Sequence, residues 1–271
     1  MKVSLQEVNE IIRCPNCLKT IELKKSEDSQ CYSCGEYYMK LPFSWDLIPS
    51  SFNSMDLGDI WKQLQANGMI SYIEDPINNL SVGDRSDCHE FAQFCSFDGL
   101  VLDVGCGPQP WPSYFSHYSE RTRFIGIDPL VGESAADYFQ IRSAGEFLPF
   151  KDEAFDHVVF ATSLDHVIDP VKSLSEARRI SKQDGHINIW IGEKTPNAPK
   201  PETSNEWYKK LKRPENAEDV FHLKRLKLLD LAFMLDMADL EIIDKKSNSI
   251  DEYKTIYFLK TKRKPKIKGK I

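Results

Sequence analysis

Four cysteines near the start of the chain have the types and spacing of a metal site. Two residues separate Cys14 from Cys17 and Cys31 from Cys34, and thirteen residues lie between the pairs. This spacing lets a tight turn point both thiolates at one centre, and two such turns supply the four soft ligands of a tetrahedral zinc ion. Four thiolates leave no position for water, so we expect a structural zinc. A redox dithiol needs only one such pair and does not explain two.

A second group of residues suited to chemistry lies in the stretch VLDVGCGPQP, residues 101–110. It predicts a strand that ends in a turn of small residues, where backbone amides approach a ligand closely. A dinucleotide-binding loop requires a third glycine, and Pro110 stands there instead. Asp103 precedes the first glycine, Gly105, by two residues, and a carboxylate there suits a cation better than a pyrophosphate. These residues favour S-adenosylmethionine, with its sulfonium and amino group, over NAD.

A second acid supports this cofactor. In FIGIDPL, Asp128 ends the next expected strand, a position from which a carboxylate can accept hydrogen bonds from both ribose hydroxyls. The alternative is that Asp103 and Asp128 only cap turns. Because both acids follow strands at matching positions, the cofactor interpretation is favoured.

The elements expected around these residues alternate between strands and helices. Strands are expected at 100–104, 124–127, 138–141, 157–161, 187–191, 240–246 and 253–260. Helices are expected at 60–75, 86–97, 112–120, 170–181 and 223–238. This alternation indicates an α/β protein with a mostly parallel sheet covered by helices on both faces.

From Leu100 onward, six stretches resemble the class I S-adenosylmethionine-dependent methyltransferases of the type 11 group. They are VLDVGCG, GIDP, LPFKDEAFD, LDHVIDP, EARRISKQDG and INIW. The resemblance implies a Rossmann-like sheet of seven strands. It also implies contacts with the cofactor: Asp103, Gly105 and Gly107 at the methionine end, Asp128 at the ribose, and Gly145 and Glu146 beside adenine. Ala144 stands where the family often has an aspartate that binds the adenine amine.

The first fifty residues resemble the zinc ribbons related to the methyltransferase activator Trm112, through the cysteines and the following GEYY. We therefore expect a zinc ribbon at 1–50, a linker and helices at 51–98, the methyltransferase domain at 99–260 and a basic tail at 261–271. Residues 193–222 form a polar insert with four prolines just past an expected strand, which indicates a lid over the ligand site.

Three side chains are candidates for the acceptor end of the site. Asp165 and His166 follow the strand expected at 157–161, and His222 ends the insert. Methyl transfer from a sulfonium is an in-line displacement, so the enzyme mainly positions the acceptor, and a general base helps when the acceptor is a hydroxyl. In the resembling family, the histidine at the position of His166 often shapes the pocket without taking a proton, and both roles remain open.

Charge and hydropathy restrict the partners. No apolar run reaches the length of a membrane span, and the first ten residues lack the pattern of a signal peptide, so we expect a cytoplasmic protein without membrane contact. The net charge is −6, although the residues from Lys260 onward are basic. An acidic body disfavours a broad nucleic-acid-binding face.

These observations predict a methyltransferase for a small polar acceptor, such as the hydroxyl or amine of a sugar or natural product. One alternative is a methyltransferase of rRNA or tRNA bases whose ribbon contacts RNA. A second alternative is a non-catalytic scaffold that binds the cofactor and recruits a partner through the ribbon.

Overall fold

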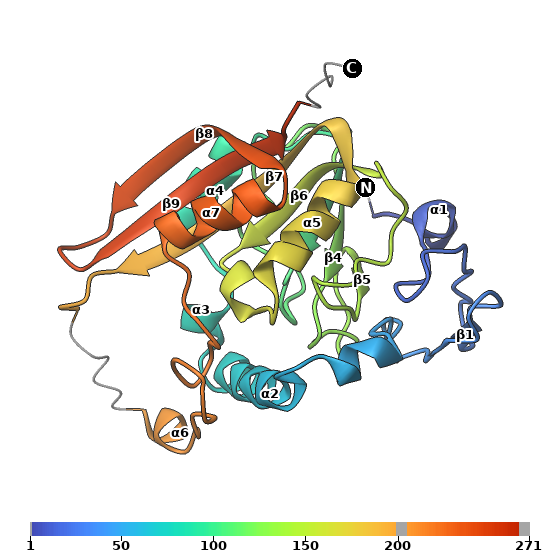
Figure 1. Cartoon of the computed structure of the whole chain (residues 1–271), viewed down its shortest axis with the longest axis horizontal. Coiled ribbons are helices and arrows are strands. Elements are labelled where there is room, and N and C mark those ends of the chain that lie inside the picture. Colours follow the sequence, from blue (N-terminus) through green and yellow to red (C-terminus); the bar gives the residue numbers. More distant parts are fainter. Residues whose placement is uncertain (1, 199–204, 266–271) are drawn as a thin grey trace, which may run out of the picture.

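A seven-stranded sheet forms the centre of the protein in this computed structural model, which describes residues 2–198 and 205–265 (Figure 1). The strand order is β5-β4-β3-β6-β7-β9-β8, and only β9 runs antiparallel to its neighbours. The strands are β3 (Leu100–Val104), β4 (Arg123–Ile127), β5 (Phe139–Ile141), β6 (Phe155–Ala161), β7 (Ser181–Lys194), β8 (Leu240–Ser249) and β9 (Lys254–Arg263). The mostly parallel, Rossmann-like sheet predicted from the sequence is confirmed.

The central strands are short apolar runs because both of their faces are covered. In β3 and β4, every residue after the first is buried. These two strands pair in register from Leu100–Arg123 to Val104–Ile127, so they end side by side. Next to the edge strand β8, β9 continues to Arg263, three residues into the expected basic tail. Residues 266–271 of that tail lie outside the described residues.

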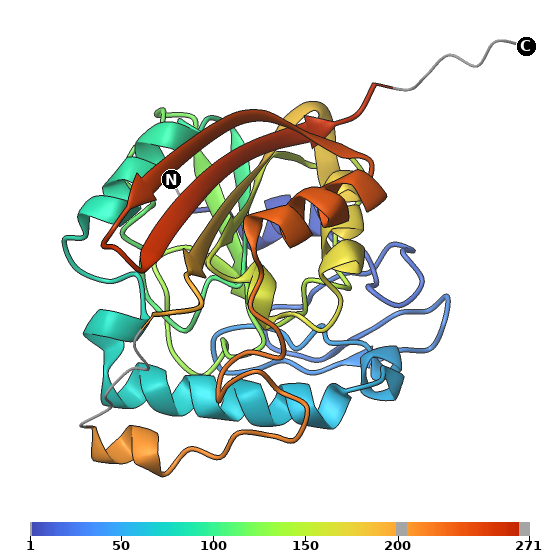
Figure 2. The ribbon, with the colours of Figure 1, turned by 60° about the vertical axis from the view of Figure 1, so that its left-hand side comes forward.

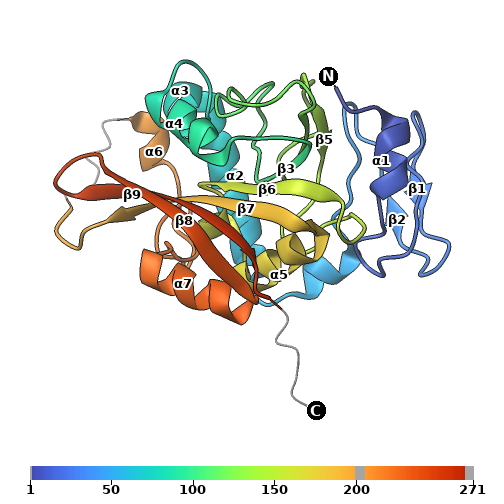
Figure 3. The ribbon, with the colours of Figure 1, turned by 90° about the horizontal axis from the view of Figure 1, so that it is seen from above.

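Helices cover both faces of the sheet (Figure 3). On one face lies α4 (Ser86–Cys95), and on the other lie α5 (Pro170–Ile180) and α7 (Leu228–Met237). The start of α5 follows from its sequence, because Pro170 occupies its first turn and the Asp169 side chain accepts a hydrogen bond from the Lys172 amide. Within the described chain, no helix is both long and apolar enough to cross a membrane.

The helix predicted at 112–120 is wrong, because this segment forms turns. Ser113 holds this segment against the chain near Ser81, because both its amide and its hydroxyl donate to the Ser81 carbonyl oxygen. Tyr114 and Phe115 are adjacent and both buried. The aromatic spacing therefore reflects packing on β4, where Phe115 stacks on Phe124 at 3.9 Å between ring centroids.

The helix α2 (Gly58–Glu74) runs across the end of the sheet, and the short α3 (Pro76–Asn79) and α6 (Glu206–Lys209) lie beside it (Figure 2). Asn67 on α2 is buried, and its amide donates to the carbonyl oxygens of Lys212 and Val220 at 3.0 and 2.7 Å. These two bonds fix the last part of the insert expected at 193–222 against α2.

The N-terminal segment lies against the β5 edge of the sheet (Figure 3). It contains α1 (Leu5–Ile11), β1 (Ser29–Gln30), β2 (Tyr37–Tyr38) and the short helix η1 (Ser50–Ser54). The Arg13 amide donates to the Pro149 carbonyl oxygen, and Trp45 stacks on Phe139 of β5 at 5.7 Å. Apolar residues of this segment and of the sheet form one continuous buried cluster. The segment and the sheet therefore share a core.

Candidate functional site

The four cysteines of the predicted metal site lie close together. The sulfur atoms of Cys14 and Cys34 lie 3.6 Å apart, as do those of Cys17 and Cys31, and all four fall within 4.8 Å of one another. Zinc–sulfur bonds of about 2.3 Å place tetrahedral sulfurs about 3.8 Å apart, so the spacing fits zinc. All four are free thiols. The turns that carry them are closed by two hydrogen bonds: the Leu18 amide donates to the Cys14 carbonyl oxygen, and the Gly35 amide donates to the Cys31 carbonyl oxygen.

The glycine loop after β3 is held by β4. Amides of Gly105 and Cys106 donate to the Ile127 carbonyl oxygen at 2.8 and 3.1 Å. The Gly107 amide donates to the Asp128 carboxylate at 2.9 Å. Gly105 has a φ of +83°, and a Cβ atom there would lie 2.3 Å from the Ser163 Cβ. Only glycine therefore fits this position, which brings the loop close to the segment after β6.

Two buried carboxylates stand beside this loop with little compensating charge. Asp103 accepts a hydrogen bond from the Tyr114 hydroxyl at 2.7 Å, and its other oxygen is buried without a partner in the described structure. Burial raises the pKa of Asp103 to about 7 and that of Asp128 to about 6. A positively charged ligand would relieve this cost, since a nearby cation favours the ionised carboxylate. The two carboxylates thus fit the positively charged sulfonium and amino group of S-adenosylmethionine.

A cavity of about 320 Å³ opens at the carboxyl ends of the strands. Its walls include five of the six predicted cofactor residues, namely Gly105, Gly107, Asp128, Gly145 and Glu146. Asp103 is not among the residues that line the cavity, but Tyr114, which donates a hydrogen bond to it, does line the cavity.

Glu146 connects the cavity wall to the chain that precedes α5. One oxygen of its buried carboxylate accepts hydrogen bonds from the amides of Ile168 and Asp169 at 2.7 and 3.1 Å. The second oxygen is buried, and the described residues give it no partner. Burial raises the pKa of this carboxyl group. Glu146 therefore holds the loop before α5 in place with one carboxylate oxygen, and its second oxygen can accept a hydrogen bond from a ligand.

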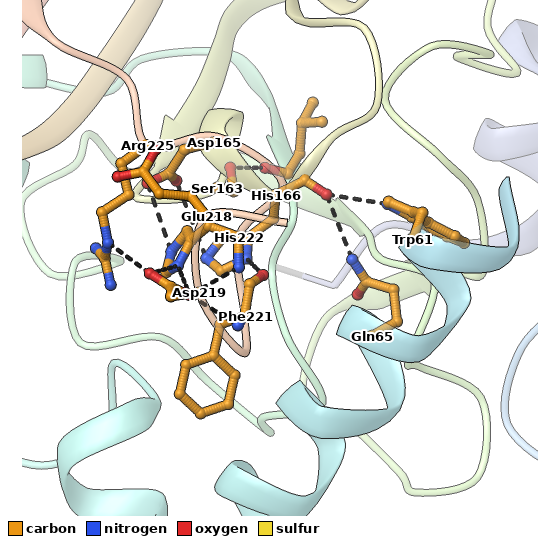
Figure 4. Close-up of polar contacts among 11 residues, drawn as sticks. Trp61, Gln65, Ser163, Asp165, His166, Glu218, Asp219, Phe221, His222 and Arg225 are labelled. Carbon is orange, nitrogen blue, oxygen red and sulfur yellow. Dashed lines mark hydrogen bonds and ion pairs between the residues drawn. The ribbon is translucent and has the colours of Figure 1, made fainter. Parts of the chain in front are cut away.

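The three predicted acceptor-end residues come together at the other end of the cavity (Figure 4). Asp165 and His166 lie in the short helix η2 (Leu164–His166), and His222 arrives from the insert. The two histidine rings lie 4.2 Å apart, and both line the cavity. The Asp165 carboxylate approaches both rings: its Oδ2 atom lies 3.6 Å from His222 Nε2, and its Oδ1 atom lies 3.9 Å from His166 Nε2.

Each histidine is oriented through its Nδ1 atom. His166 Nδ1 lies 3.2 Å from the Phe221 carbonyl oxygen, which can only accept. His222 Nδ1 lies 2.8 Å from Asp219, whose other oxygen accepts from Arg225 Nε at 2.7 Å. Burial lowers the pKa of His166 to about 4, so its ring is neutral at neutral pH. Both Nδ1 atoms therefore act as donors, and both Nε2 atoms face Asp165.

Sequence reasoning missed the residues that support this cluster. Trp61 Nε1 and Gln65 Nε2 on α2 donate to the His166 carbonyl oxygen at 3.0 and 3.4 Å. Asp219 is also absent from the sequence-based set. The one sequence signal that could have identified Asp219 is its position three residues before His222.

Residues 102–189 match the family model described as a methyltransferase domain. Over these residues the chain is similar to a methyltransferase domain. The matched residues run from β3 to β7 of the central sheet. This domain holds the glycine loop, Asp128, Glu146 and the pair Asp165 and His166, whereas His222 lies beyond the matched residues.

Curated relatives match the methyltransferase domain over a limited length. An uncharacterized protein of Methanocaldococcus jannaschii is 45% identical over 99 residues, which are 34% of this chain and 43% of the relative. An uncharacterized methyltransferase of Schizosaccharomyces pombe is 32% identical over 104 residues, 32% of this chain and 37% of the relative. The chain thus spans about two fifths of the length of these relatives.

A solved structure matches over more of the chain. The 1,6-didemethyltoxoflavin-N1-methyltransferase of Burkholderia thailandensis superposes with a TM-score of 0.53, covering 88% of this chain and 100% of its own at 11% identity. At this identity the likeness shows the fold alone.

Proposed function

We propose that the protein transfers a methyl group from S-adenosylmethionine to a small polar acceptor by in-line displacement. The observation that carries this proposal is one cavity with two chemically different ends. One end has the glycine loop and Asp128, and the other has His166 and His222. The cofactor and the acceptor thereby meet inside a single enclosed space, which supplies most of the catalysis that an activated methyl donor requires.

At the cofactor end, we assign Gly105 and Gly107 to the methionine portion and Asp128 to the ribose. Asp103 acts on the methionine portion by its charge and through Tyr114. Gly145 and Glu146 border adenine. Ala144 offers no polar group, so backbone atoms and the free oxygen of Glu146 recognise the adenine edge.

At the acceptor end, we assign Asp165, His166 and His222 to binding the acceptor's polar atom and to disposing of its proton. A hydroxyl or amine of a sugar or natural product suits this end, because the cavity is closed by α2 and by the end of the insert. The described part of that insert acts as a lid. The Burkholderia enzyme of the same fold has 1,6-didemethyltoxoflavin and S-adenosylhomocysteine bound together.

We further propose that Cys14, Cys17, Cys31 and Cys34 hold a structural zinc ion in a Trm112-like ribbon. The sulfur spacing supports this assignment. Zinc would supply folding energy at the start of the chain rather than chemistry at the cavity. The free thiols also suit a reducing compartment, and we place the protein in the cytoplasm on that ground.

Calorimetric titration with S-adenosylhomocysteine and a mass-shift screen of hydroxyl and amine acceptors with S-adenosylmethionine test the function. Binding of the cofactor product and a gain of one methyl mass by a small acceptor are expected. Binding of a nicotinamide dinucleotide in place of both methionine cofactors would exclude the proposal.

One observation favours methylation of RNA as a second candidate function. Tyr32 and Phe43 of the ribbon are 91% and 56% exposed, and exposed aromatic rings can stack on unpaired bases. A gel-shift assay with structured RNA at low and physiological salt tests this. RNA binding that weakens in the Tyr32→Ala variant would place RNA ahead of a small acceptor.

A further inference from the structure

Three ligating atoms at the acceptor end surround one point. Asp165, His166 and His222 each offer one ligating atom, and these three atoms all lie within 4.8 Å of one another. The separations of 3.6 and 3.9 Å between Asp165 and the two nitrogens are too long for hydrogen bonds. Ligands at about 2.1 Å from a tetrahedral cation lie about 3.4 Å apart, so a small contraction would seat a metal ion here.

The contacts behind the two histidines are those of metal-bound imidazoles. A metal-bound histidine almost always donates its other ring N–H to a carboxylate or backbone carbonyl, which fixes the ring and leaves the opposite lone pair for the metal. His222 has the Asp219 carboxylate in this role, and His166 has the Phe221 carbonyl oxygen. Arg225 in turn holds Asp219. The cluster is thus supported on both sides and open toward Asp165.

The charge balance also favours a cation. Among the described residues, the only ion-pair partners found for Asp165 are these two histidines. The Asp165 side chain is 17% exposed and that of His222 is 8% exposed, so water screens the carboxylate poorly. Asp84 and His89 form a contrasting pair on the surface: their side chains are in direct contact at 2.8 Å, and no third ligating residue joins them among the described residues.

We propose that Asp165, His166 and His222 bind one divalent transition-metal ion, such as Zn²⁺, at the acceptor end of the cavity. This proposal rests on the proposed methyl transfer and narrows its acceptor to a hydroxyl compound. Three protein ligands leave an open position for an acceptor oxygen, as in catalytic zinc sites.

A metal ion at this position explains how the acceptor hydroxyl loses its proton. A hydroxyl bound to the cation releases its proton to water, because the cation stabilises the resulting alkoxide. The alkoxide oxygen then forms a bond to the methyl carbon while the carbon–sulfur bond breaks, and its electron pair remains on sulfur. The products are a methyl ether, neutral S-adenosylhomocysteine and a solvated proton. A protonated amine has no lone pair for the metal and is excluded.

Zinc stoichiometry of the full chain tests the proposal. The protein is loaded with Zn²⁺ alone, and gel filtration removes the unbound metal. Elemental mass spectrometry then gives the number of zinc ions per chain. Two zinc ions per wild-type chain are expected, one at the cysteines and one at the cavity. His222→Ala and His166→Ala should each retain one, whereas His89→Ala, the matched control, should retain two.

Calorimetry with S-adenosylhomocysteine on the same samples separates this proposal from the proposed function. A wild-type chain that binds S-adenosylhomocysteine but holds one zinc ion overturns the metal site alone, and leaves His222 as a general base oriented by Asp219. Two zinc ions in a folded His222→Ala chain would overturn it as well. If the alanine variants do not fold, the Asp219→Asn variant replaces them in this test. Because Asp219 orients His222, we expect this variant to bind the second zinc ion with a roughly 10- to 100-fold weaker affinity. Unchanged affinity in that variant counts against the site.

Discussion

The Asp128 carboxylate at the end of β4 accepts a hydrogen bond from the Gly107 amide at 2.9 Å, and so fastens the loop that follows the neighbouring strand β3. Its other oxygen accepts from the Leu130 amide at 2.8 Å. One side chain therefore shapes two loops that border the same cavity. The parallel register of β3 and β4, which ends at Val104 and Ile127, makes this contact possible.

Replacement of Asp128 by asparagine should weaken S-adenosylhomocysteine binding by roughly 1–3 kcal/mol, which is about a 5- to 150-fold higher dissociation constant. An asparagine amide cannot accept at both positions, so one loop loses its anchor and the ribose loses an acceptor. Calorimetry provides the measurement. Asp98→Asn is the control, because Asp98 pairs with Arg121 at the opposite end of β3. Equal affinity in both variants would show that Asp128 is not the ribose ligand.

Alanine at Gly105 should abolish cofactor binding, whereas alanine at Gly83 should not. Both glycines have positive φ, +83° and +77°, so both substitutions introduce backbone strain of about 1 kcal/mol. Only at Gly105 would the new Cβ collide with Ser163, and a Cβ at Gly83 meets nothing within 4 Å. Melting temperature and S-adenosylhomocysteine affinity of the two variants distinguish strain from collision. Similar binding by both would mean that the loop can move aside.

Cofactor affinity should depend on pH through the two buried acids. Burial raises the pKa of Asp103 to about 7 and of Asp128 to about 6, so both are ionised above pH 7. As the pH falls through 7 and then 6, each carboxylate takes up a proton and loses its attraction for the cofactor's positive charge. The dissociation constant should therefore rise between pH 8 and pH 5.

Tyr114→Phe checks the direction of this effect. The Tyr114 hydroxyl donates to Asp103 and thereby stabilises its ionised form. Without that hydroxyl, the pKa of Asp103 should rise further, and the loss of affinity should begin at higher pH. A profile that is flat in the wild type, or unchanged in this variant, would remove Asp103 from cofactor binding.

The sequence predicted the sheet well because buried parallel strands are apolar along their whole length. The expected strand at 100–104 coincides with β3, and the others differ only at their ends. The helix expected at 112–120 failed because Tyr114 and Phe115 face the core through turns that are held by Ser113. Such hydrogen bonds to a distant segment leave no periodic signal.

The acceptor end was predicted only as separate residues. Asp165 and His166 follow β6 directly, so their position at the strand ends could be inferred. His222 comes from a polar insert, and nothing local to it predicts that its ring lies 4.2 Å from that of His166. The role of α2 was missed for the same reason, since its contact with the insert depends on the buried Asn67. Contacts between distant segments require the folded chain.

The ribbon cysteines allow a last test, because the ribbon and the sheet share one core. Val8 and Ile12 belong to the same buried cluster as Phe150 beside the sheet, and Trp45 stacks on Phe139. Cys31→Ser should release the ribbon zinc and loosen this core. We expect a fall of about 10 °C in melting temperature for the whole chain in a single transition.

Cys88→Ser is the matched control for this loss. Cys88 is buried on α4 and belongs to none of the metal-binding groups found among the described residues, so its replacement should leave the zinc content unchanged. Differential scanning calorimetry with zinc analysis follows both variants. Two separate transitions in Cys31→Ser, with the larger one at the wild-type temperature, would mean that the ribbon folds independently of the sheet. A single lowered transition instead makes zinc part of what stabilises the methyltransferase domain, because the apolar residues that it organises are the ones that cover the β5 edge.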